Sequence, residues 1–211
     1  MISIVDYGLG NILAFTNIYK RLNIPVSVVS TMQELQTAER IILPGVGSFD
    51  WAMSKLNESG MREQLDKQVM EEQVPVIGIC VGMQMMGKRS EEGQEEGLGW
   101  LDAEVKRFDE STFTQETHLP HMGWNDVKHV VTHPLFAGLE EEARFYFLHS
   151  YYFSEEDSSQ VLAQTDYNGL YTSIAYRENI YGVQFHPEKS HHWGVRLLKN
   201  FAEMPLCLDP E

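Results

Sequence analysis

The feature that most constrains this chain is a short apolar run, residues 75–79, that ends in the pattern Gly-x-Cys-x-Gly around Cys80. A helical pattern follows, which is typical of a nucleophile elbow, a sharp strand-to-helix turn with the reactive side chain at its tip. A side chain at Gly78 or Gly82 would clash with the turn or with the packed helix. Cys80 would then lie at a helix N-terminus, where peptide dipoles favour the thiolate. The alternative, a small buried residue between two packing glycines, stays open at this point.

Short apolar segments alternate with helical patterns in the first half of the chain. This alternation predicts an α/β fold with a mostly parallel sheet that is covered by helices on both faces. Chemistry in such sheets collects at the carboxyl ends of the strands, where Gly8, Gly45 and Cys80 are expected. Ser48 is a plausible N-cap for the helix after the third strand. The expected strands are 2–5, 25–29, 40–43 and 74–79, and the expected helices begin near residues 12, 48 and 61.

The second half of the chain is richer in strand patterns. Asn168-Gly169 is a strong hairpin signal and Glu178-Asn179 a weaker one, so we expect antiparallel strands that extend or flank the parallel sheet. A closing helix is expected around residues 195–201, and residues 109–119 read as an exposed polar linker. The strand candidates are 103–108, 124–131, 144–153, 161–165, 171–177 and 180–184.

Composition limits the classes of function. The 211 residues fit a single domain, 1–211, and the net charge of −15 makes nucleic acid an unlikely partner because phosphate binding needs a basic patch. There are only two cysteines, Cys80 and Cys207, and Cys207 has no motif around it. The first residues carry no basic segment followed by a long apolar one, and no run is long enough to span a membrane. We therefore expect a cytoplasmic protein with no membrane association.

A second motif raises the odds that Cys80 is a nucleophile. The apolar strand that begins at residue 180 ends abruptly before His186-Pro187-Glu188. Residues i and i+2 of an extended segment project to the same side, so Glu188 can reach back to His186. A carboxylate that is hydrogen-bonded to one imidazole nitrogen leaves the other nitrogen free as a base. Taken alone, His186 could be a capped or core histidine and Glu188 a surface acid. These alternatives explain the two residues less well once Cys80 is considered with them.

Acyl chemistry at Cys80 would also need an oxyanion hole, a pair of backbone N–H groups aimed at one point. One donor should be Val81, the residue after the nucleophile. The glycine-rich segment 44–47 follows a parallel strand and can expose a second amide. A simple strand-to-helix turn is the alternative for this segment.

These motifs together resemble the triad, or class I, glutamine amidotransferases, whose domain is flavodoxin-like. More narrowly, the chain is similar to the glutaminase subunits of imidazole glycerol phosphate synthases. The blocks that carry the resemblance extend from residue 6 to residue 190. They are residues 6–11, 44–49, 78–84, 120–125, 145–151 and 182–190.

The resemblance implies a glutaminase that needs no cofactor and no metal. Cys80 would attack the side-chain amide of glutamine, His186 would move the protons, and Glu188 would orient His186. The backbone amides of Val46 and Val81 would form the oxyanion hole. The positions that match glutamine-binding residues are Gly47, Gln84, Ser150 and Tyr151.

The resemblance also implies a protein partner, a (β/α)₈ cyclase subunit that forms a heterodimer with this chain. Ammonia would pass to the cyclase, which makes imidazole glycerol phosphate and an aminoimidazole carboxamide ribotide, AICAR, in histidine biosynthesis. Trp124 would be an aromatic anchor of the interface. The positions that match partner-facing residues are Asn11, Trp124, Tyr146 and Lys189.

Three alternatives stay open at this stage. A paralogue with the same hydrolytic chemistry could supply ammonia to a sugar-amidating enzyme of surface polysaccharide synthesis. A catalytically silent module could keep the fold and only dock a partner, although the intact Cys80, His186 and Glu188 speak against this. A stand-alone cysteine hydrolase would be active without a partner.

Overall fold

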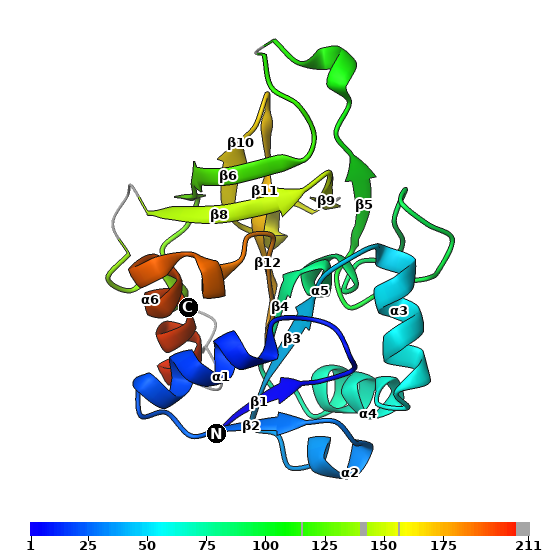
Figure 1. Ribbon diagram of the computed structural model, residues 1–211, viewed down its shortest axis with the longest axis vertical. Helices are drawn as coiled ribbons and strands as arrows, with labels where there is room; N and C mark the ends of the chain where they lie inside the picture. The colour runs from blue at the N-terminus through cyan, green and yellow to red at the C-terminus, as the bar shows by residue number, and fades with distance from the viewer. Residues whose placement is uncertain (115, 140–142, 156, 206–211) are drawn as a thin grey trace.

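The computed structural model describes residues 1–114, 116–139, 143–155 and 157–205. Its main feature is a 10-stranded mixed sheet with the order β2-β1-β3-β4-β12-β11-β10-β7, to which β9 and β5 are added through β11. A separate two-stranded sheet, β6-β8, crosses the upper half of the molecule (Figure 1). Cys207 lies outside the described residues.

The parallel half of the large sheet forms the lower part of the molecule in Figure 1. Neighbouring strands from β2 to β12 are all parallel, and β1, β3, β4 and β12 are buried along their whole length. Burial on both faces explains why these strands read as continuous apolar runs rather than as alternating patterns. The bounds are Ile2–Val5 for β1, Val26–Val29 for β2, Arg40–Gly45 for β3, Val76–Cys80 for β4 and Ile180–Val183 for β12.

The antiparallel half continues the same sheet, as the hairpin signals predict. Asn168 and Gly169 both have positive φ, at 57° and 139°, and they connect β10 to its antiparallel neighbour β11. Glu178, at φ 55°, lies in the second turn, between β11 and β12. The bounds are Ala103–Arg107 for β5, Lys128–His129 for β7, Tyr151–Glu155 for β9, Val161–Asp166 for β10 and Leu170–Arg177 for β11.

The small sheet pairs β6 (His121–Asp126) with β8 (Arg144–His149). Its two faces differ sharply, because alternate side chains point to opposite sides of a strand. The inner face contributes His121, Phe145, Phe147 and His149 to the interior. The outer face carries Met122, Trp124, Tyr146 and Leu148. An apolar outer face on a two-stranded sheet is the kind of surface that a partner would cover.

Helices cover the parallel strands from both sides, with α1 and α6 to the left and α3 and α4 to the right in Figure 1. α6 begins four residues before the expected closing helix. A single core runs between helices and sheet and continues under the small sheet. The bounds are Ile12–Arg21 for α1, Met32–Leu35 for α2, Phe49–Glu58 for α3, Arg62–Asp66 for α4, Val81–Gln84 for α5 and His191–Glu203 for α6.

Several expected elements have different bounds in the structure. The expected strand 144–153 is two strands that separate at Ser150 and belong to different sheets. The expected strand 124–131 is divided into β6, which begins three residues earlier, and the short β7. The helix near residue 61 continues after α4 as a π-helical turn, Lys67–Glu71. Ser48 is the N-cap of α3, but its side chain makes no capping hydrogen bond. The Phe49 amide at the start of the helix donates to the Glu92 carboxylate at 2.8 Å.

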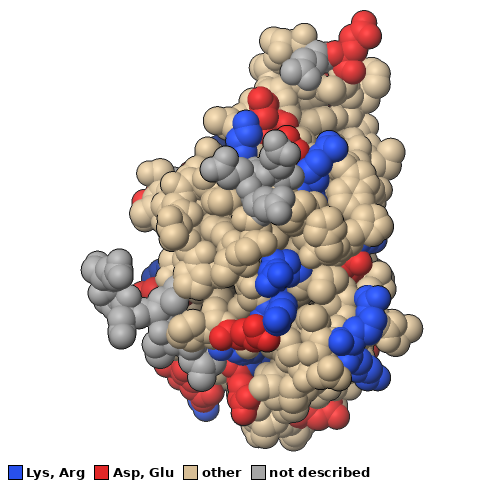
Figure 2. All heavy atoms as spheres, turned by 90° about the vertical axis from the view of Figure 1, so that its left-hand side faces the viewer, with Lys and Arg blue, Asp and Glu red and all other residues tan. Residues whose placement is uncertain are grey.

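The surface on the side of α1 and α6 carries mixed charges, as Figure 2 shows. Lys and Arg side chains occur there in small groups separated by uncharged residues, and acidic side chains gather towards the lower end. None of the helices in the described part of the chain is long and apolar enough to cross a membrane.

Candidate active site

Cys80 lies at the tip of a strained turn between β4 and α5. Its backbone has φ 55° and ψ −112°, a combination that residues other than glycine seldom adopt and that functional sites often hold under strain. The turn is fixed by close packing of two glycines. A Cβ on Gly82 would collide with the Leu43 carbonyl oxygen, and one on Gly78 would lie 2.6 Å from the Gly82 oxygen. The geometry is that of the predicted nucleophile elbow.

His186 faces Cys80 from the end of the neighbouring strand. β12 pairs in parallel with β4, so residues that follow the two strands meet at one edge of the sheet. The imidazole Nδ1 lies 2.9 Å from Oε1 of Glu188, and both side chains are nearly buried, at 4% and 2% exposed. The Cys80 side chain interacts with the same imidazole and contributes to its raised pKa. The structure therefore brings the three predicted residues together in the predicted order.

The electrostatics of the group favour a proton on the imidazole. Burial lowers the pKa of His186, but the contacts with Cys80 and Glu188 together outweigh burial and raise the pKa to about 10. An imidazolium beside a cysteine sulfur is the environment that stabilises a thiolate nucleophile.

The backbone of His186 is anchored to the small sheet. Its amide donates to the Tyr146 carbonyl at 2.8 Å, and its carbonyl accepts from the Ser190 hydroxyl at 2.6 Å. The Ser190 oxygen in turn accepts from the Tyr146 amide at 3.0 Å. Because Tyr146 is on β8, a shift of that strand would displace the His186 backbone.

The two expected oxyanion donors follow adjacent parallel strands, with Gly45 of β3 directly opposite Cys80. Val81 is the first residue of α5, so its N–H has no acceptor within the helix. Val46 comes directly after β3 and precedes Gly47, whose φ of +88° requires a glycine-like backbone. The Tyr7 hydroxyl donates to the Pro44 carbonyl at 2.6 Å and so fixes the start of this segment.

The candidate glutamine-binding residues lie in two places. Gln84 is buried at the end of α5, and its Nε2 donates to the Tyr151 carbonyl at 3.1 Å. Ser150 is the break between β8 and β9, and Tyr151 is the first residue of β9. Gly47 is exposed just beyond the oxyanion segment. The structure thus links Gln84 directly to Tyr151 and places Gly47 beside Val46.

Two polar residues at the site were missed by the sequence reasoning. Gln184 is fully buried, accepts from Gln84 Nε2 at 3.1 Å, and has its own Nε2 at 3.9 Å from Cys80 Sγ. Its spacing of two residues from His186 was the available signal, since both then point to the same side of the strand. Ser190 is the last residue of the block 182–190, and no role of its own was inferred for it from the sequence.

The predicted partner-facing residues lie around the outer face of the small sheet. The Trp124 ring is 39% exposed and stacks on His191, with ring centroids 5.0 Å apart and planes at 8°. The Lys189 ammonium lies 5.7 Å from the centroid of the Tyr146 ring. Asn11 is exposed at the start of α1, a helix that contacts the turn carrying Lys189.

The described residues contain no group of three His, Cys, Asp or Glu side chains placed to hold a metal ion. The site brings a buried thiol, an imidazole and a carboxylate close to the backbone of Val46 and Val81, a set of groups suited to acyl transfer.

The family model for class I glutamine amidotransferases matches residues 3–204. The chain belongs to this family of enzymes. Among its relatives, a protein of Bdellovibrio bacteriovorus named imidazole glycerol phosphate synthase subunit HisH is 56% identical over 97% of this chain and 100% of its own length. A protein of the same name from Leptospira interrogans is 50% identical over the same shares. A solved structure titled as a glutamine amidotransferase has a similar fold, with a TM-score of 0.74 over 96% of this chain and 97% of its own, at 22% identity.

Proposed function

We propose that this chain hydrolyses glutamine to glutamate and ammonia as the glutaminase subunit of an imidazole glycerol phosphate synthase. The observation that carries the proposal is the buried contact series from Cys80 through His186 to Glu188 at the end of two adjacent parallel strands. The relatives that match 97% of the chain are named as subunits of that synthase, which supports the assignment to histidine biosynthesis.

The reaction follows from the positions of the groups. The Cys80 sulfur attacks the side-chain carbonyl carbon of glutamine, and the carbon–nitrogen bond breaks as His186 gives its proton to the departing ammonia. Water then attacks the thioester with His186 as base, which releases glutamate and regenerates the thiolate. Glu188 accepts from Nδ1 of His186 and so fixes the ring orientation through both steps.

The transition state would be stabilised by the backbone amides of Val46 and Val81, since negative charge develops on the carbonyl oxygen. Gln84, Gly47, Ser150 and Tyr151 would hold the amino-acid part of the substrate. The hydrogen bond from Gln84 to the Tyr151 carbonyl holds these two residues in place before substrate enters.

The ammonia would pass to a separate (β/α)₈ cyclase subunit bound in a cytoplasmic heterodimer, where imidazole glycerol phosphate and AICAR are formed. The outer face of the small sheet supports such a partner. It presents Met122 at 65% exposed, with Leu148 and Trp124 at 39% each. Tyr146 belongs to the same face, Lys189 lies over its ring, and Asn11 would lie at the edge of the face. An aromatic anchor surrounded by apolar residues is typical of a stable protein interface.

The decisive experiment is to copurify the chain with its candidate cyclase and measure glutamine hydrolysis with and without the cyclase and its ribotide substrate. We expect the complex to hydrolyse glutamine and the isolated chain to be nearly inactive. Cys80→Ala should abolish glutamine-dependent turnover while turnover with added ammonia persists in the complex. Unchanged glutaminase activity in Cys80→Ala would refute the assignment of the nucleophile.

The same experiment separates the alternatives. Glutamine hydrolysis that responds only to a sugar-amidating enzyme would identify a paralogue with another ammonia acceptor. Binding of the cyclase without any hydrolysis would identify a docking module. Rapid hydrolysis by the isolated chain would identify a stand-alone hydrolase and would contradict control by a partner.

A further inference from the structure

A chain of buried polar groups continues from the glutamine pocket to the small sheet, and neither the triad nor the partner surface accounts for it. We propose that Tyr171 is a positioning residue of the glutamine site, because its hydroxyl joins His121 and His149 into one hydrogen-bonded path from β6 to Gln84. This inference rests on the function proposed above, and it concerns how the pocket is held rather than the chemistry at Cys80.

The path begins at the Tyr151 carbonyl, which receives two hydrogen bonds. Gln84 Nε2 donates to it at 3.1 Å, and His149 Nδ1 lies 2.8 Å from it. A carbonyl oxygen can only accept, so the proton of His149 must be on Nδ1. Burial, together with the charge that His121 would carry, lowers the pKa of His149 to about 3, so the ring is neutral and its Nε2 is an acceptor.

Tyr171 continues the path as a donor to one histidine ring and an acceptor from the other. Its hydroxyl lies 3.2 Å from His149 Nε2, to which it donates, and 3.1 Å from His121 Nδ1, from which it accepts. Burial lowers the pKa of His121 to about 4, so this ring too is neutral and carries its proton on Nδ1. The Thr165 hydroxyl also lies beside the Tyr171 oxygen, and it donates to the Asp126 carbonyl at 3.0 Å.

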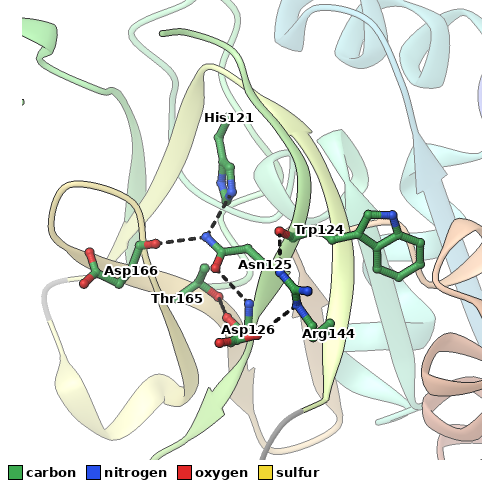
Figure 3. A network of polar contacts seen from close by, with 7 residues as sticks. All are labelled: His121, Trp124, Asn125, Asp126, Arg144, Thr165 and Asp166. Atoms are coloured by element: carbon green, nitrogen blue, oxygen red, sulfur yellow. Dashed lines mark hydrogen bonds and ion pairs between the residues drawn. The ribbon is translucent and has the colours of Figure 1, made fainter. Parts of the chain in front are cut away.

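The path ends on β6 at Asn125, shown in Figure 3. Asn125 Nδ2 donates to His121 Nε2 at 3.2 Å and to the Asp166 carbonyl at 2.9 Å. Its Oδ1 accepts from the Asp126 amide at 2.8 Å, which fixes the orientation of the side-chain amide. Figure 3 also shows the Trp124 ring on the opposite side of the strand from Asn125. The residue that ends the path is therefore the direct neighbour of the proposed interface anchor.

At the Gln84 end of the path, the Tyr151 carbonyl fixes the orientation of the Gln84 side-chain amide. Both hydrogens of Gln84 Nε2 are used, one by the Tyr151 carbonyl and one by Gln184 Oε1 at 3.1 Å. The carbonyl oxygen of Gln84 is thus the group that it can offer to a ligand, and an acceptor in this place suits the N–H groups of glutamine. Loss of the Tyr151 carbonyl position would let the amide rotate and would present the wrong atom to substrate.

Packing makes the path rigid. The His121 ring is held between Phe147, with centroids 4.6 Å apart, and Tyr167, with centroids 4.0 Å apart, and both stacks are nearly parallel. Tyr171 is 4% exposed and His149 is 7% exposed. Buried rings with every polar atom paired have one favourable arrangement, whereas a missing hydroxyl leaves two unpaired nitrogens in an apolar site.

The test is Tyr171→Phe in the complex with the cyclase, with Tyr167→Phe as the matched control. The control also removes one tyrosine hydroxyl beside His121, but that hydroxyl donates to the His118 carbonyl and is not on the path. We expect Tyr171→Phe to raise the KM for glutamine about tenfold, with a smaller change in kcat and none in ammonia-dependent turnover. The control should leave the KM within about twofold of wild type.

A second measurement does not depend on activity or on the variant folding. Nitrogen-15 spectra of the histidine rings in the wild-type protein should show His121 and His149 as neutral Nδ1–H tautomers from pH 5 to 8. The proposal is overturned if either ring carries its proton on Nε2, or if Tyr171→Phe leaves the KM unchanged while the wild-type complex hydrolyses glutamine. Absence of glutamine hydrolysis by the wild-type complex would refute the proposed function instead, and the spectra would still report on the path.

Discussion

At the scale of single residues, the site depends on the contact between His186 and Glu188. The carboxylate is almost fully buried and its Oε1 accepts from the imidazole at 2.9 Å, so its charge is felt with little screening by water. In Glu188→Gln the ring loses the carboxylate that orients it, and we expect kcat for glutamine hydrolysis to fall roughly 10²–10⁴-fold. Steady-state kinetics of the complex would measure this loss. The exposed Glu110, changed to Gln, should have no effect, and equal rates for both variants would exclude an orienting role for Glu188.

The raised pKa of His186 also makes stability depend on pH. Folded His186 keeps its proton up to about pH 10, because contacts with Cys80 and Glu188 outweigh the effect of burial, whereas an unfolded histidine titrates near 6.5. Between these values the folded state binds more protons than the unfolded state. The stabilising contribution is therefore complete below about pH 6.5 and is lost as the pH rises through 10.

We expect the difference in free energy of unfolding between wild type and His186→Asn to shrink steadily from about pH 6.5 to pH 10. Urea denaturation of both proteins across this range would measure it. A difference that stays constant or grows with pH would contradict the ion pair in the folded state.

At the scale of elements, the joint between β4 and α5 sets where the nucleophile lies. Gly82→Ala would put a methyl group against the Leu43 carbonyl, which belongs to the neighbouring buried strand and has no room to move. We expect a loss of about 2–5 kcal/mol in the free energy of unfolding, the range of severe overpacking.

Gly60→Ala is the control for this substitution. Gly60 has a positive φ, +71°, which Gly82 does not have, and a Cβ there would meet no other atom within 4 Å. It should therefore show only the backbone cost, roughly 1–2 kcal/mol. Denaturant unfolding of the two variants measures both losses. Equal losses would mean that the backbone between β4 and α5 can move to accept the methyl group.

The elements themselves differ in how well the sequence predicts them. The parallel strands and the elbow at Cys80 were predictable because burial on both faces and paired glycines leave local signals. The break at Ser150 was not, because the residues on either side have the same apolar and aromatic character although they belong to different sheets. The β6 strand was also placed too late, since Gly123 interrupts the strand pattern while it pairs with Phe147.

The residues of the candidate site also differ in how well the sequence predicts them. His186 and Glu188 are two residues apart, so a rule of strand geometry connects them. Tyr171 contacts His149 only because distant segments of the chain pair and pack together, and a buried tyrosine carries no motif. Such residues become visible only when donors and acceptors are counted in three dimensions.

At the scale of the whole molecule, the two sheets hold different parts of the proposed machinery. The large sheet holds Cys80 and His186 at its carboxyl edge, whereas the small sheet holds the outer apolar face and is tied to His186 through Tyr146 and Ser190. A partner that binds the outer face would thus contact the same strand that anchors the His186 backbone. This arrangement gives a physical route by which binding of the cyclase could change glutamine hydrolysis, without requiring any contact between cyclase and Cys80.

The importance of that face can be tested at Trp124. Its ring is 39% exposed in the free chain and is supported by the stack on His191, so it is already oriented for a partner. We expect Trp124→Ala to weaken binding of the cyclase by at least about 2 kcal/mol, roughly 30-fold in Kd, because aromatic anchors at the centre of an interface contribute most to affinity. The free chain should lose less stability than a core tryptophan would cost, since much of the ring is in water.

Trp51 provides the matched control for this prediction. It is 51% exposed on α3, on the side of the molecule opposite α6 in Figure 1, and Lys55 lies over its ring. Trp51→Ala removes as large a side chain from the surface but should leave the Kd unchanged. Calorimetric titration of the cyclase into each variant measures both values. Equal affinities for the Trp124 variant and wild type would mean that the cyclase binds elsewhere, and the coupling through Tyr146 would then have no partner to act on it.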